Sequence, residues 1–333
     1  MTALATHTGS EAPTPALSII IVSYNTRDMT LNCIASVLAE TRLPHEIIVV
    51  DNASDDGSAQ AIAAQFPQVN LLAETVNHGF GPAHKIALER VRARWVLLLN
   101  PDTVVLNGAI DALMAFAGRR PEAAILGGRT LYGDRSLNPT SCYARSTLWS
   151  IFCRLAGLNG LFRSSELFNS EFYGNWPRDS ERQVDIVTGC LLLIRRETWD
   201  ALGGFDDTFV MYGEEVDLCL RARAAGYQLW VSPEATIIHY GGASQPVRSD
   251  KLVRLMRAKM ELIARHFPVG QKALGLALFR LWPLSRVLAF RGAAILTRQA
   301  RLTENARIWG EVWHQRREWQ NGFAASDHSK GGS

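Results

Sequence analysis

Short apolar runs alternate with more polar segments along the first third of the chain. Runs of large, often β-branched residues bounded by turn residues are typical of buried strands, and we expect strands at residues 17–23, 46–50, 69–73 and 95–99. The segments between them predict helices at residues 28–39, 56–66 and 83–92, the first with Asp28 as its N-cap. This repeated strand–helix order predicts an α/β fold with a mostly parallel central sheet and helices on both faces.

The pattern loosens after residue 102. We expect helices at residues 108–118, 199–205, 214–225 and from 250 onward, and strands at residues 123–127, 184–194 and 235–239. Residues 138–182 are rich in aromatic side chains, Ser, Asn and Gly and show no clear period. A long irregular stretch inside a compact domain is usually a functional loop or a lid. The sequence therefore predicts one domain over residues 17–247, with a basic amphipathic helical region over residues 248–320.

Composition describes an ordinary globular protein, with 47% apolar and 20% charged residues in 333. A net charge of +3 gives no support for nucleic-acid binding, and we expect none. The basic excess is local, with twelve Lys and Arg residues between Arg248 and Arg301 against Asp250 and Glu261. Five cysteines without a C-x-x-C pair predict reduced, packed thiols rather than a zinc site or disulfides.

The chain ends and the basic region bear on location. Residues 1–16 lack the basic and apolar regions of a signal peptide, so we expect a disordered segment and a cytoplasmic protein, with a second disordered tail at residues 321–333. No uncharged apolar run approaches the ~20 residues that span a bilayer. Apolar residues between positions 274 and 296 are interspersed with Arg280, Arg286 and Arg291. They predict helices that lie in an anionic membrane interface, or an appendage packed on the preceding domain or on a second subunit as a homodimer.

Polar residues follow several predicted strands at the point where each strand ends: Ser23-Tyr24-Asn25, Asp51-Asn52, Asn100-Pro101-Asp102 and His239. The carboxyl ends of neighbouring parallel strands converge, and ligands of open α/β sheets bind there. Asp51 and Asn52 offer hydrogen bonds to a base or a ribose, although Asp51 in such a loop is commonly an Asx-turn or N-cap residue. Gly79 and Gly81 would allow a close approach of the backbone to a ligand.

Asp102 and His239 supply a hard oxygen and an imidazole. Together with a diphosphate they could complete the shell of Mg²⁺ or Mn²⁺, which needs few protein ligands when phosphates supply the rest. The alternatives are that Asp102 is a turn residue after Pro101 and that His239 is a structural histidine.

Glu214 and Glu215 directly follow a glycine at the start of a predicted helix. Helix-start carboxylates are commonly structural and are stabilised by the helix dipole. An aromatic approach and two adjacent like charges could instead raise one pKa toward a value useful for a general base. Gly79-Phe80-Gly81 lacks the spacing of a dinucleotide fingerprint, and the chain has no P-loop pattern, so neither a dehydrogenase nor a P-loop enzyme is supported.

Seven segments lie in a consistent order over most of residues 17–245: IIIVSYN (19–25), IIVVDNASDDGS (47–58), NHGFGPAHKIAL (77–88), WVLLLNPDT (95–103), VTGCLLLIRRETWDALGGFDDTF (187–209), MYGEEVDLCLRARAAGY (211–227) and IIHYGGAS (237–244). Any one is a weak signal. The seven together resemble the inverting family-two glycosyltransferases of the GT-A fold, and most of all the bacterial rhamnosyltransferase-like branch that builds cell-surface polysaccharides. The resemblance implies a GT-A type catalytic domain over residues 17–247, followed by the helical appendage.

The resemblance also implies roles for individual residues. The nucleotide-sugar donor would be bound by Ser23, Tyr24, Asn25, Asp51, Asn52, Asn77, Gly79, Phe80, Asn100 and Asp102. Asp102 would be the remaining carboxylate of an Asp-x-Asp metal motif and would hold Mg²⁺ or Mn²⁺ with His239. Glu215 would be the general base, with Glu214 as the alternative. Gly189 and Cys190 would border the acceptor.

Three positions depart from the family pattern. Asn100 replaces the first Asp of the metal motif, Glu215 stands where Asp is usual, and His84 stands where Asn is frequent. The loss of one carboxylate should weaken metal affinity and leave more of the coordination to the diphosphate.

The expected activity is the transfer of a deoxyhexose such as rhamnose, from a dTDP- or UDP-sugar to a hydroxyl of a glycan or a lipid-linked acceptor, with inversion. We expect this to occur in the cytoplasm or on the inner face of the plasma membrane. Two competing readings are a sugar-nucleotide pyrophosphorylase and a catalytically silent, nucleotide-sugar-binding subunit of a polysaccharide assembly complex. Ser23-Tyr24-Asn25-Thr26 does not supply the Gly-rich basic loop that a pyrophosphorylase needs. The departures from the family pattern at Asn100 and Glu215 are the observations that would support the silent-subunit hypothesis.

Overall fold

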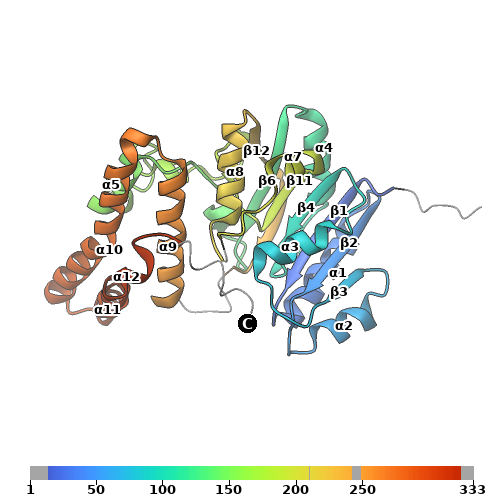
Figure 1. Ribbon diagram of the computed structural model, residues 1–333, viewed down its shortest axis with the longest axis horizontal. Coiled ribbons are helices and arrows are strands. Elements are labelled where there is room, and N and C mark those ends of the chain that lie inside the picture. The colour runs from blue at the N-terminus through green and yellow to red at the C-terminus, as the bar shows by residue number, and fades with distance from the viewer. Residues whose placement is uncertain (1–13, 210, 242–248, 324–333) are drawn as a thin grey trace, which may run out of the picture.

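A computed structural model of the protein describes residues 14–209, 211–241 and 249–323, and it has a large mixed sheet beside a group of helices (Figure 1). The expected disorder of residues 1–13 and 324–333, the 247/248 boundary and the last three residues of the 237–244 segment lie outside the described residues. The main sheet has ten strands with the order β3-β2-β1-β4-β11-β6-β12-β5, and with β7 on β6 and β9 on β12. The strands of the ordered path are β1 (Leu17–Ser23), β2 (His45–Asp51), β3 (Asn70–Ala73), β4 (Trp95–Leu99), β5 (Thr103–Val105), β6 (Ala123–Leu131), β11 (Leu191–Arg195) and β12 (Gln228–His239).

The amino-terminal half of the sheet is parallel. β1 pairs in parallel with β2 and β4, and β2 with β3, in the register Ser23 opposite Asp51 and Asp51 opposite Ala73. All seven residues of β1 are buried, as expected for a strand covered on both faces. β11 lies antiparallel between β4 and β6, while β12 is parallel to β6 and antiparallel to β5. The α/β class and the mostly parallel strands of this half are as the sequence predicts.

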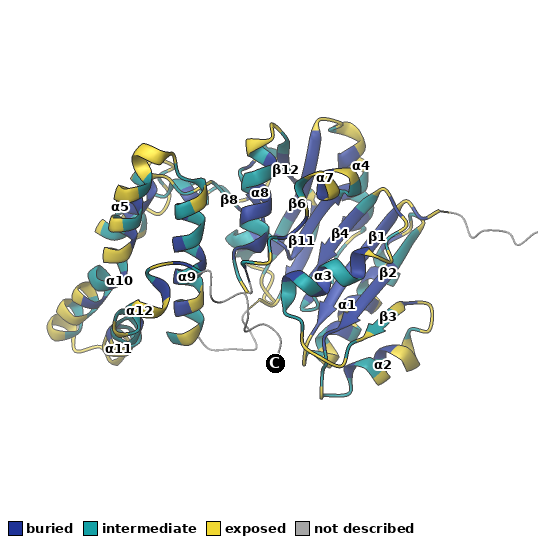
Figure 2. Ribbon diagram, viewed as in Figure 1, coloured by how far each residue is buried: buried dark blue, intermediate teal, exposed yellow. Residues whose placement is uncertain are grey.

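Helices cover both faces of the sheet. One hydrophobic core joins β1, β2 and β4 to α1 (Arg27–Glu40), α2 (Ser58–Gln65) and α4 (Ala109–Arg119). The core on the opposite face joins the sheet to α3 (Phe80–Leu88), α7 (Arg196–Leu202) and α8 (Glu214–Ala224). Figure 2 shows the strands as the most deeply buried layer. Because the apolar side chains alternate between the two faces, the carboxyl ends of the strands remain as the place where polar groups gather.

A third core holds a separate helical group at the left of Figure 1. Its helices are α5 (Leu148–Ala156), α9 (Ser249–His266), α10 (Val269–Thr297), α11 (Ala300–His314) and α12 (Arg316–Trp319). Phe279 and Trp319 are its largest fully buried side chains. α5 comes from the segment that we expected to be an irregular lid, so the helical group is built from two distant parts of the chain.

That segment differs most from the expectation. Residues 138–182 contain β7 (Leu137–Asn138), η1 (Pro139–Ser141), β8 (Cys142–Tyr143), α5, α6 (Leu158–Leu161), η2 (Ser170–Phe172) and β9 (Arg182–Gln183). α5 is amphipathic but only nine residues long, and the Ser-, Asn- and Gly-rich sequence around it shows no period that extends this helix.

Other boundaries also move. The apolar strand expected at 184–194, with an interruption at Gly189, is two strands, β10 (Ile186–Val187) and β11, because the chain turns at residues 188–190. β12 begins at Gln228 rather than at residue 235, since a register shift between Val231 and Thr236 takes up the polar residues in between. α1 begins at Arg27, so Asp28 lies in its first turn and Thr26 is the cap. Phe323, expected in the disordered tail, packs against Phe209.

α10 is long and apolar enough to cross a membrane by length and composition, and 22% of its most apolar window is buried. The helix qualifies because its arginines are widely spaced, although they leave no uncharged run of that length within it. Pro283 lies within it, and the Arg280 and Arg286 side chains donate hydrogen bonds to backbone carbonyls of Gln320 and Arg154. One side of α10 therefore packs on protein.

Candidate active site

The ends of β1, β2 and β3 are joined by backbone hydrogen bonds. The Asn52 N–H donates to the Ser23 carbonyl at 2.8 Å, and the Glu74 N–H donates to the Asp51 carbonyl at 2.9 Å. The segments that follow the three strands therefore form one continuous edge. This is the edge on which the sequence places the donor.

Two of the residues predicted there have internal roles. The Ser23 side chain is buried, with its hydroxyl 2.8 Å from that of Thr30. Asn25 has a left-handed φ of 51°, and its side-chain oxygen accepts the Asp55 N–H at 2.9 Å. Tyr24, between them, is exposed. Ser23 and Asn25 thus shape the turn, and Tyr24 is left free to contact a ligand.

Asn52 fixes the loop that leads into α3. Its amide donates to the Asn77 side-chain oxygen at 2.9 Å and to the Gly79 carbonyl at 3.2 Å, while its own oxygen accepts the His78 N–H at 2.9 Å. Gly79 has φ +84°, a conformation that favours glycine. Phe80 follows as the first residue of α3, so these residues form one connected unit.

Asp51 is buried at the end of β2. One of its oxygens accepts the Ser54 N–H at 3.3 Å, which is the turn role that the sequence left open. The other oxygen is buried and has no hydrogen-bond partner among the described residues. A buried carboxylate oxygen without a hydrogen bond is energetically costly, so this atom is suited to accept a hydrogen bond from a ligand.

Asp102 and His239 lie side by side, although they are far apart in the sequence. His239 Nε2 lies 3.3 Å from Asp102 Oδ1 and 3.4 Å from the Asn100 amide nitrogen. The Tyr240 N–H also donates to the Asp102 carbonyl, at 3.0 Å. Burial disfavours the imidazolium, but Cys190 and the Asp102 carboxylate favour it more strongly and raise the pKa of His239.

The same pair fits a small divalent cation. Two neighbouring ligands of an octahedral ion with bonds of about 2.1 Å are about 3 Å apart, close to the 3.3 Å between the two side-chain atoms. No group of three or more His, Cys, Asp or Glu residues suited to a metal occurs within residues 14–209, 211–241 and 249–323. A cation at Asp102 and His239 would therefore need oxygen ligands from a bound diphosphate or from water.

The turn over residues 188–190 connects this pair to the start of α8. The Asn100 N–H donates to the Cys190 carbonyl at 3.3 Å, and the Thr188 hydroxyl lies 3.2 Å from the Cys190 sulfur. A Cβ on Gly189 would lie 3.8 Å from Phe80 Cζ and 4.0 Å from Glu215 Cβ. Gly189 and Cys190 therefore lie between the Asp102–His239 pair and Glu215.

Local geometry at the start of α8 requires glycine. Gly213 has φ +98°, and a Cβ there would lie 2.9 Å from the Phe209 ring. After this turn the side chains of Glu214 and Glu215 have different surroundings. Glu214 is 5% exposed, and its Oε2 is buried with no hydrogen-bond partner in the described part of the chain. Glu215 is partly exposed and lines a cavity.

Both carboxyl groups hold their protons more tightly than usual. Burial and the neighbouring Glu215 raise the pKa of Glu214. Burial also raises the pKa of Glu215, partly opposed by backbone hydrogen bonds at the helix start. Of the two, Glu215 has the exposure that a group needs if it is to exchange a proton with a ligand.

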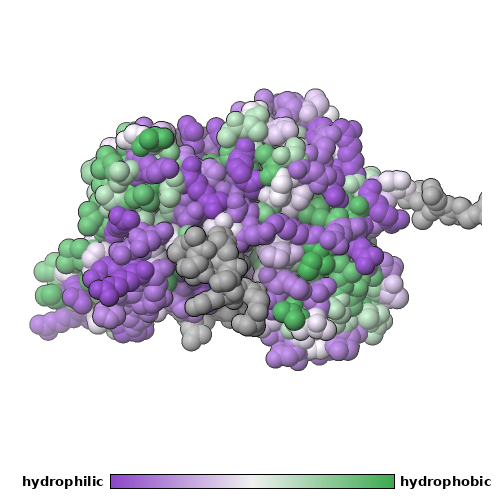
Figure 3. Space-filling model, in the orientation of Figure 1, coloured by the Kyte–Doolittle hydropathy of each residue, from purple (hydrophilic) through white to green (hydrophobic). Residues whose placement is uncertain are grey.

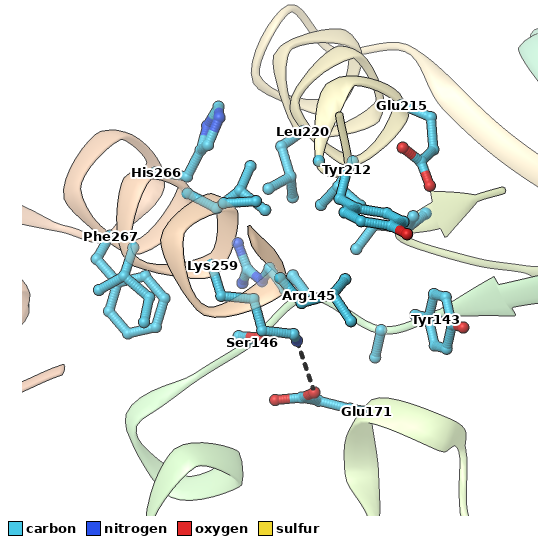
Figure 4. A pocket seen from close by; sticks show the side chains of 18 of the residues that line it. Tyr143, Arg145, Ser146, Glu171, Tyr212, Glu215, Leu220, Lys259, His266 and Phe267 are labelled. Carbon is cyan, nitrogen blue, oxygen red and sulfur yellow. Dashed lines mark ion pairs between the residues drawn. The ribbon is translucent and has the colours of Figure 1, made fainter. Parts of the chain in front are cut away.

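The cavity beside Glu215 has a volume of about 540 Å³ (Figure 4). Thr188, Tyr143 and Tyr212 line it near the glutamate, and the remainder extends toward α9. Asp51 and Asp102 are not among its lining residues. The structure thus places the predicted donor residues on one side of the Gly189–Cys190 turn and a cavity on the other.

Sequence reasoning missed most of this cavity. Tyr143 and Arg145 fall in the segment expected to be an irregular lid, and Lys259 is one of many cations in the basic region after residue 248. The aromatic content of that segment was the one available signal. The unusual His84 is buried, with Nδ1 2.8 Å from the Phe80 carbonyl and its pKa lowered by burial, so it serves as a packing residue of α3.

Comparison with known proteins finds one matching family model and several relatives with similar names. Residues 18–175 match the model of the Glycosyl transferase family 2 domain. An N-acetylglucosaminyl-diphospho-decaprenol L-rhamnosyltransferase of Mycobacterium tuberculosis (strain CDC 1551 / Oshkosh) is 30% identical over 238 residues, which cover 68% of this chain and 76% of the relative. Rhamnosyltransferase WbbL of Escherichia coli (strain K12) is 26% identical over 232 residues, which cover 67% and 82%.

A solved structure shares the fold. The mannosyltransferase of Pyrobaculum calidifontis, in complex with GDP-Man and Mn²⁺, has a TM-score of 0.57 at 16% identity, over 92% of this chain and 88% of that one. The family predicted from the seven segments is confirmed by these similarities. The protein belongs to Glycosyl transferase family 2 and is a glycosyltransferase.

Proposed function

We propose that the protein transfers a deoxyhexose, with rhamnose as the first candidate, from a nucleoside-diphosphate sugar to a hydroxyl of a lipid-linked saccharide. The transfer inverts the anomeric centre and serves cell-surface polysaccharide synthesis. The names of the two rhamnosyltransferase relatives support the sugar, and the decaprenol-linked name of the first supports the acceptor. The observation that carries the proposal is the Gly189–Cys190 turn, which has Asp102 and His239 on one side and Glu215 on the other.

Glu215 is the general base of this proposal. Its carboxylate accepts the proton of the acceptor hydroxyl as the oxygen forms a bond to the anomeric carbon. The bond from that carbon to the diphosphate breaks, and its electron pair leaves with the diphosphate. General-base assistance of this kind contributes about 10²–10⁴-fold.

Asp102 and His239 would hold Mg²⁺ or Mn²⁺. The cation, when bound, supplies positive charge that stabilises the departing diphosphate. Asn100 would help to position the His239 ring through the contact between its amide nitrogen and Nε2. The unpaired oxygen of Asp51 and the exposed ring of Tyr24 would contact the nucleoside.

Donor choice can be tested by thermal shift with a panel of nucleotide sugars, each with Mn²⁺ or Mg²⁺. A ligand that binds only the native state raises the apparent melting temperature. We expect the largest shift with dTDP-rhamnose. A larger shift with a UDP-sugar would change the assigned donor.

Activity is tested by following nucleoside diphosphate release with and without acceptor. We expect release from dTDP-rhamnose to depend on added metal and to increase with an N-acetylglucosaminyl-diphospholipid acceptor. A donor that binds but is never consumed, with either metal, would favour the silent-subunit reading.

The pH profile should show the raised pKa of Glu215. A base acts only when it is unprotonated, so kcat/KM should fall as the pH drops through this pKa, which lies above the ordinary value of 4.5. The check is a profile from pH 4 to 9 under saturating metal. A rate that stays level down to about pH 4.5 would contradict the assignment of Glu215.

We also propose that the outer face of α10 binds an anionic membrane surface. Leu274, Leu281, Leu288 and Ile295 recur every seven residues along this face and are 53%, 47%, 63% and 78% exposed. Arg280, Arg291 and Arg298 are exposed on or near the same helix. In the space-filling view, apolar surface gathers over the end of the molecule that carries α5 and α10 (Figure 3). Apolar residues with flanking arginines suit a peripheral helix on anionic lipid.

The double variant Leu281→Glu/Leu288→Glu should lose vesicle binding. Each leucine would lose partial burial and gain a repelled charge, which we expect to weaken binding by about tenfold or more. The measurement is cosedimentation with phosphatidylglycerol vesicles at low salt. Gln60→Glu/Gln65→Glu adds the same charge on exposed positions of α2 and should bind as the unmodified protein does. A protein that ignores the vesicles but forms a dimer sensitive to the leucine changes would show a subunit interface instead.

A further inference from the structure

The cavity beside Glu215 joins a polar middle to an apolar end. In Figure 4, Arg145 and Lys259 lie between Glu215 of α8 and Phe267, which follows α9. Phe267 belongs to one hydrophobic cluster with Ile263 of α9 and Phe279 of α10, which also line the cavity. Leu220 of α8 and Leu255 and Leu262 of α9 add further apolar lining. A ligand that fills this cavity from Glu215 onward would meet positive charge first and then hydrocarbon.

The positive charge exceeds its internal partners. Four cations line the cavity, Arg145, Arg154, Arg223 and Lys259. Glu171 pairs with both Arg154 and Lys259, the latter at 3.9 Å, and Asp185 pairs with Arg223. With the ionised Glu215, which also lines the cavity, four cations against three carboxylates leave one positive charge that the described residues do not balance.

Arg145 and Lys259 are the two cations whose positive charge is least compensated by neighbouring carboxylates. Only the backbone N–H of Arg145 binds Asp185, at 2.8 Å, and its exposed guanidinium has no carboxylate partner among the described residues. Burial and the neighbouring Arg154 lower the pKa of Lys259, because its share of Glu171 does not fully compensate them. Repulsion from Arg145 likewise adds to burial in lowering the pKa of Arg223. An anionic ligand would offset both of these repulsions between cations.

We propose that Arg145 and Lys259 bind the diphosphate of a lipid-linked acceptor, with the first part of its lipid chain against the apolar end of the cavity. The sugar would then lie toward Glu215, which accepts the hydroxyl proton. This inference rests on the proposed function, because it names the acceptor class for the same base. α10 supplies Phe279 to the cavity from its buried side and carries the exposed leucines on its outer side, so the same helix borders the cavity and the proposed membrane surface.

Isothermal titration calorimetry of the full chain with farnesyl diphosphate tests the assignment. EDTA is included so that no metal supports diphosphate binding at Asp102, and no sugar donor is used. Inorganic pyrophosphate and farnesol are titrated separately as the two halves of the probe. We expect farnesyl diphosphate to bind at least about tenfold more tightly than either half.

Arg145→Gln should weaken farnesyl diphosphate binding by about tenfold or more, through loss of a charge-assisted contact. Lys259→Met, which keeps the apolar stem and leaves Glu171 paired with Arg154, should act in the same direction. Arg42→Gln is the matched control, since Arg42 is exposed at the amino-terminal end of β2 and lines no part of the cavity. Circular dichroism and the melting temperature report whether each variant is folded.

Several results would overturn the assignment. They are no binding of farnesyl diphosphate, binding that Arg145→Gln leaves unchanged in a folded protein, or equal affinity for pyrophosphate, which would exclude the lipid part. Because the titration needs neither donor nor metal, a failure of sugar transfer alone would count against the proposed function and leave the acceptor cavity standing.

Discussion

Glu215→Gln should reduce kcat for sugar transfer by about 10²–10⁴-fold, because the amide cannot accept the proton of the acceptor hydroxyl. The change keeps the size and position of the side chain at the start of α8, so donor binding should persist. The measurement is initial-rate kinetics for transfer, together with donor affinity by calorimetry. Donor affinity within about threefold of the unmodified protein would show that the loss lies in the chemical step.

Two further substitutions make this result specific. Glu214→Gln changes the other candidate, whose carboxyl is buried and does not line the cavity, and should cost less than Glu215→Gln. Glu197→Gln is a matched control, because Glu197 also lies in the first turn of a helix but is exposed on α7. Near-normal turnover of the Glu215 variant with a large loss for Glu214→Gln would move the base to Glu214.

The second large effect is expected at Asp102. Asp102→Asn removes the only carboxylate beside His239 in the described structure and should lower kcat/KM by about 10²–10³-fold, because the departing diphosphate loses stabilisation of its charge. Addition of Mn²⁺ should tighten donor binding in the unmodified protein and have little effect in the variant. Calorimetry with and without Mn²⁺ measures this directly.

Asp200→Asn is the control for Asp102→Asn, since Asp200 is exposed and pairs with Arg196 within α7. It should retain normal kinetics. If Asp102→Asn kept both its turnover and its response to Mn²⁺, then the diphosphate would be stabilised by other groups.

The sequence was sufficient to predict the sheet edge. Apolar runs such as Ile19–Val22 and Val96–Leu99 can be buried only between two layers, and the polar residues that follow them mark the strand ends. The structure joins those ends as expected, with Asn52 bonded to the residue that ends β1. The sequence also indicates local geometry where only one residue type fits, as at Gly213, the glycine before the two glutamates.

Contacts between distant segments could not be read in this way. α5 is a short amphipathic helix inside a segment without a clear period, and only its packing with α10 in one hydrophobic core shows it to be part of the helical group. The cavity requires Arg145 from that segment and Lys259 from α9 to meet, and no local spacing encodes such a meeting. The choice between Glu214 and Glu215 likewise depends on which side of α8 faces the cavity, which neither residue's type reveals.

The most direct test of a single reaction centre is a crystal structure of the E215Q variant with Mn²⁺ and the nucleotide sugar selected by thermal shift. We expect Mn²⁺ on Asp102 with the diphosphate, and the anomeric carbon of the sugar facing position 215 across the Gly189–Cys190 turn. A sugar directed away from α8, or a metal bound apart from Asp102, would contradict it.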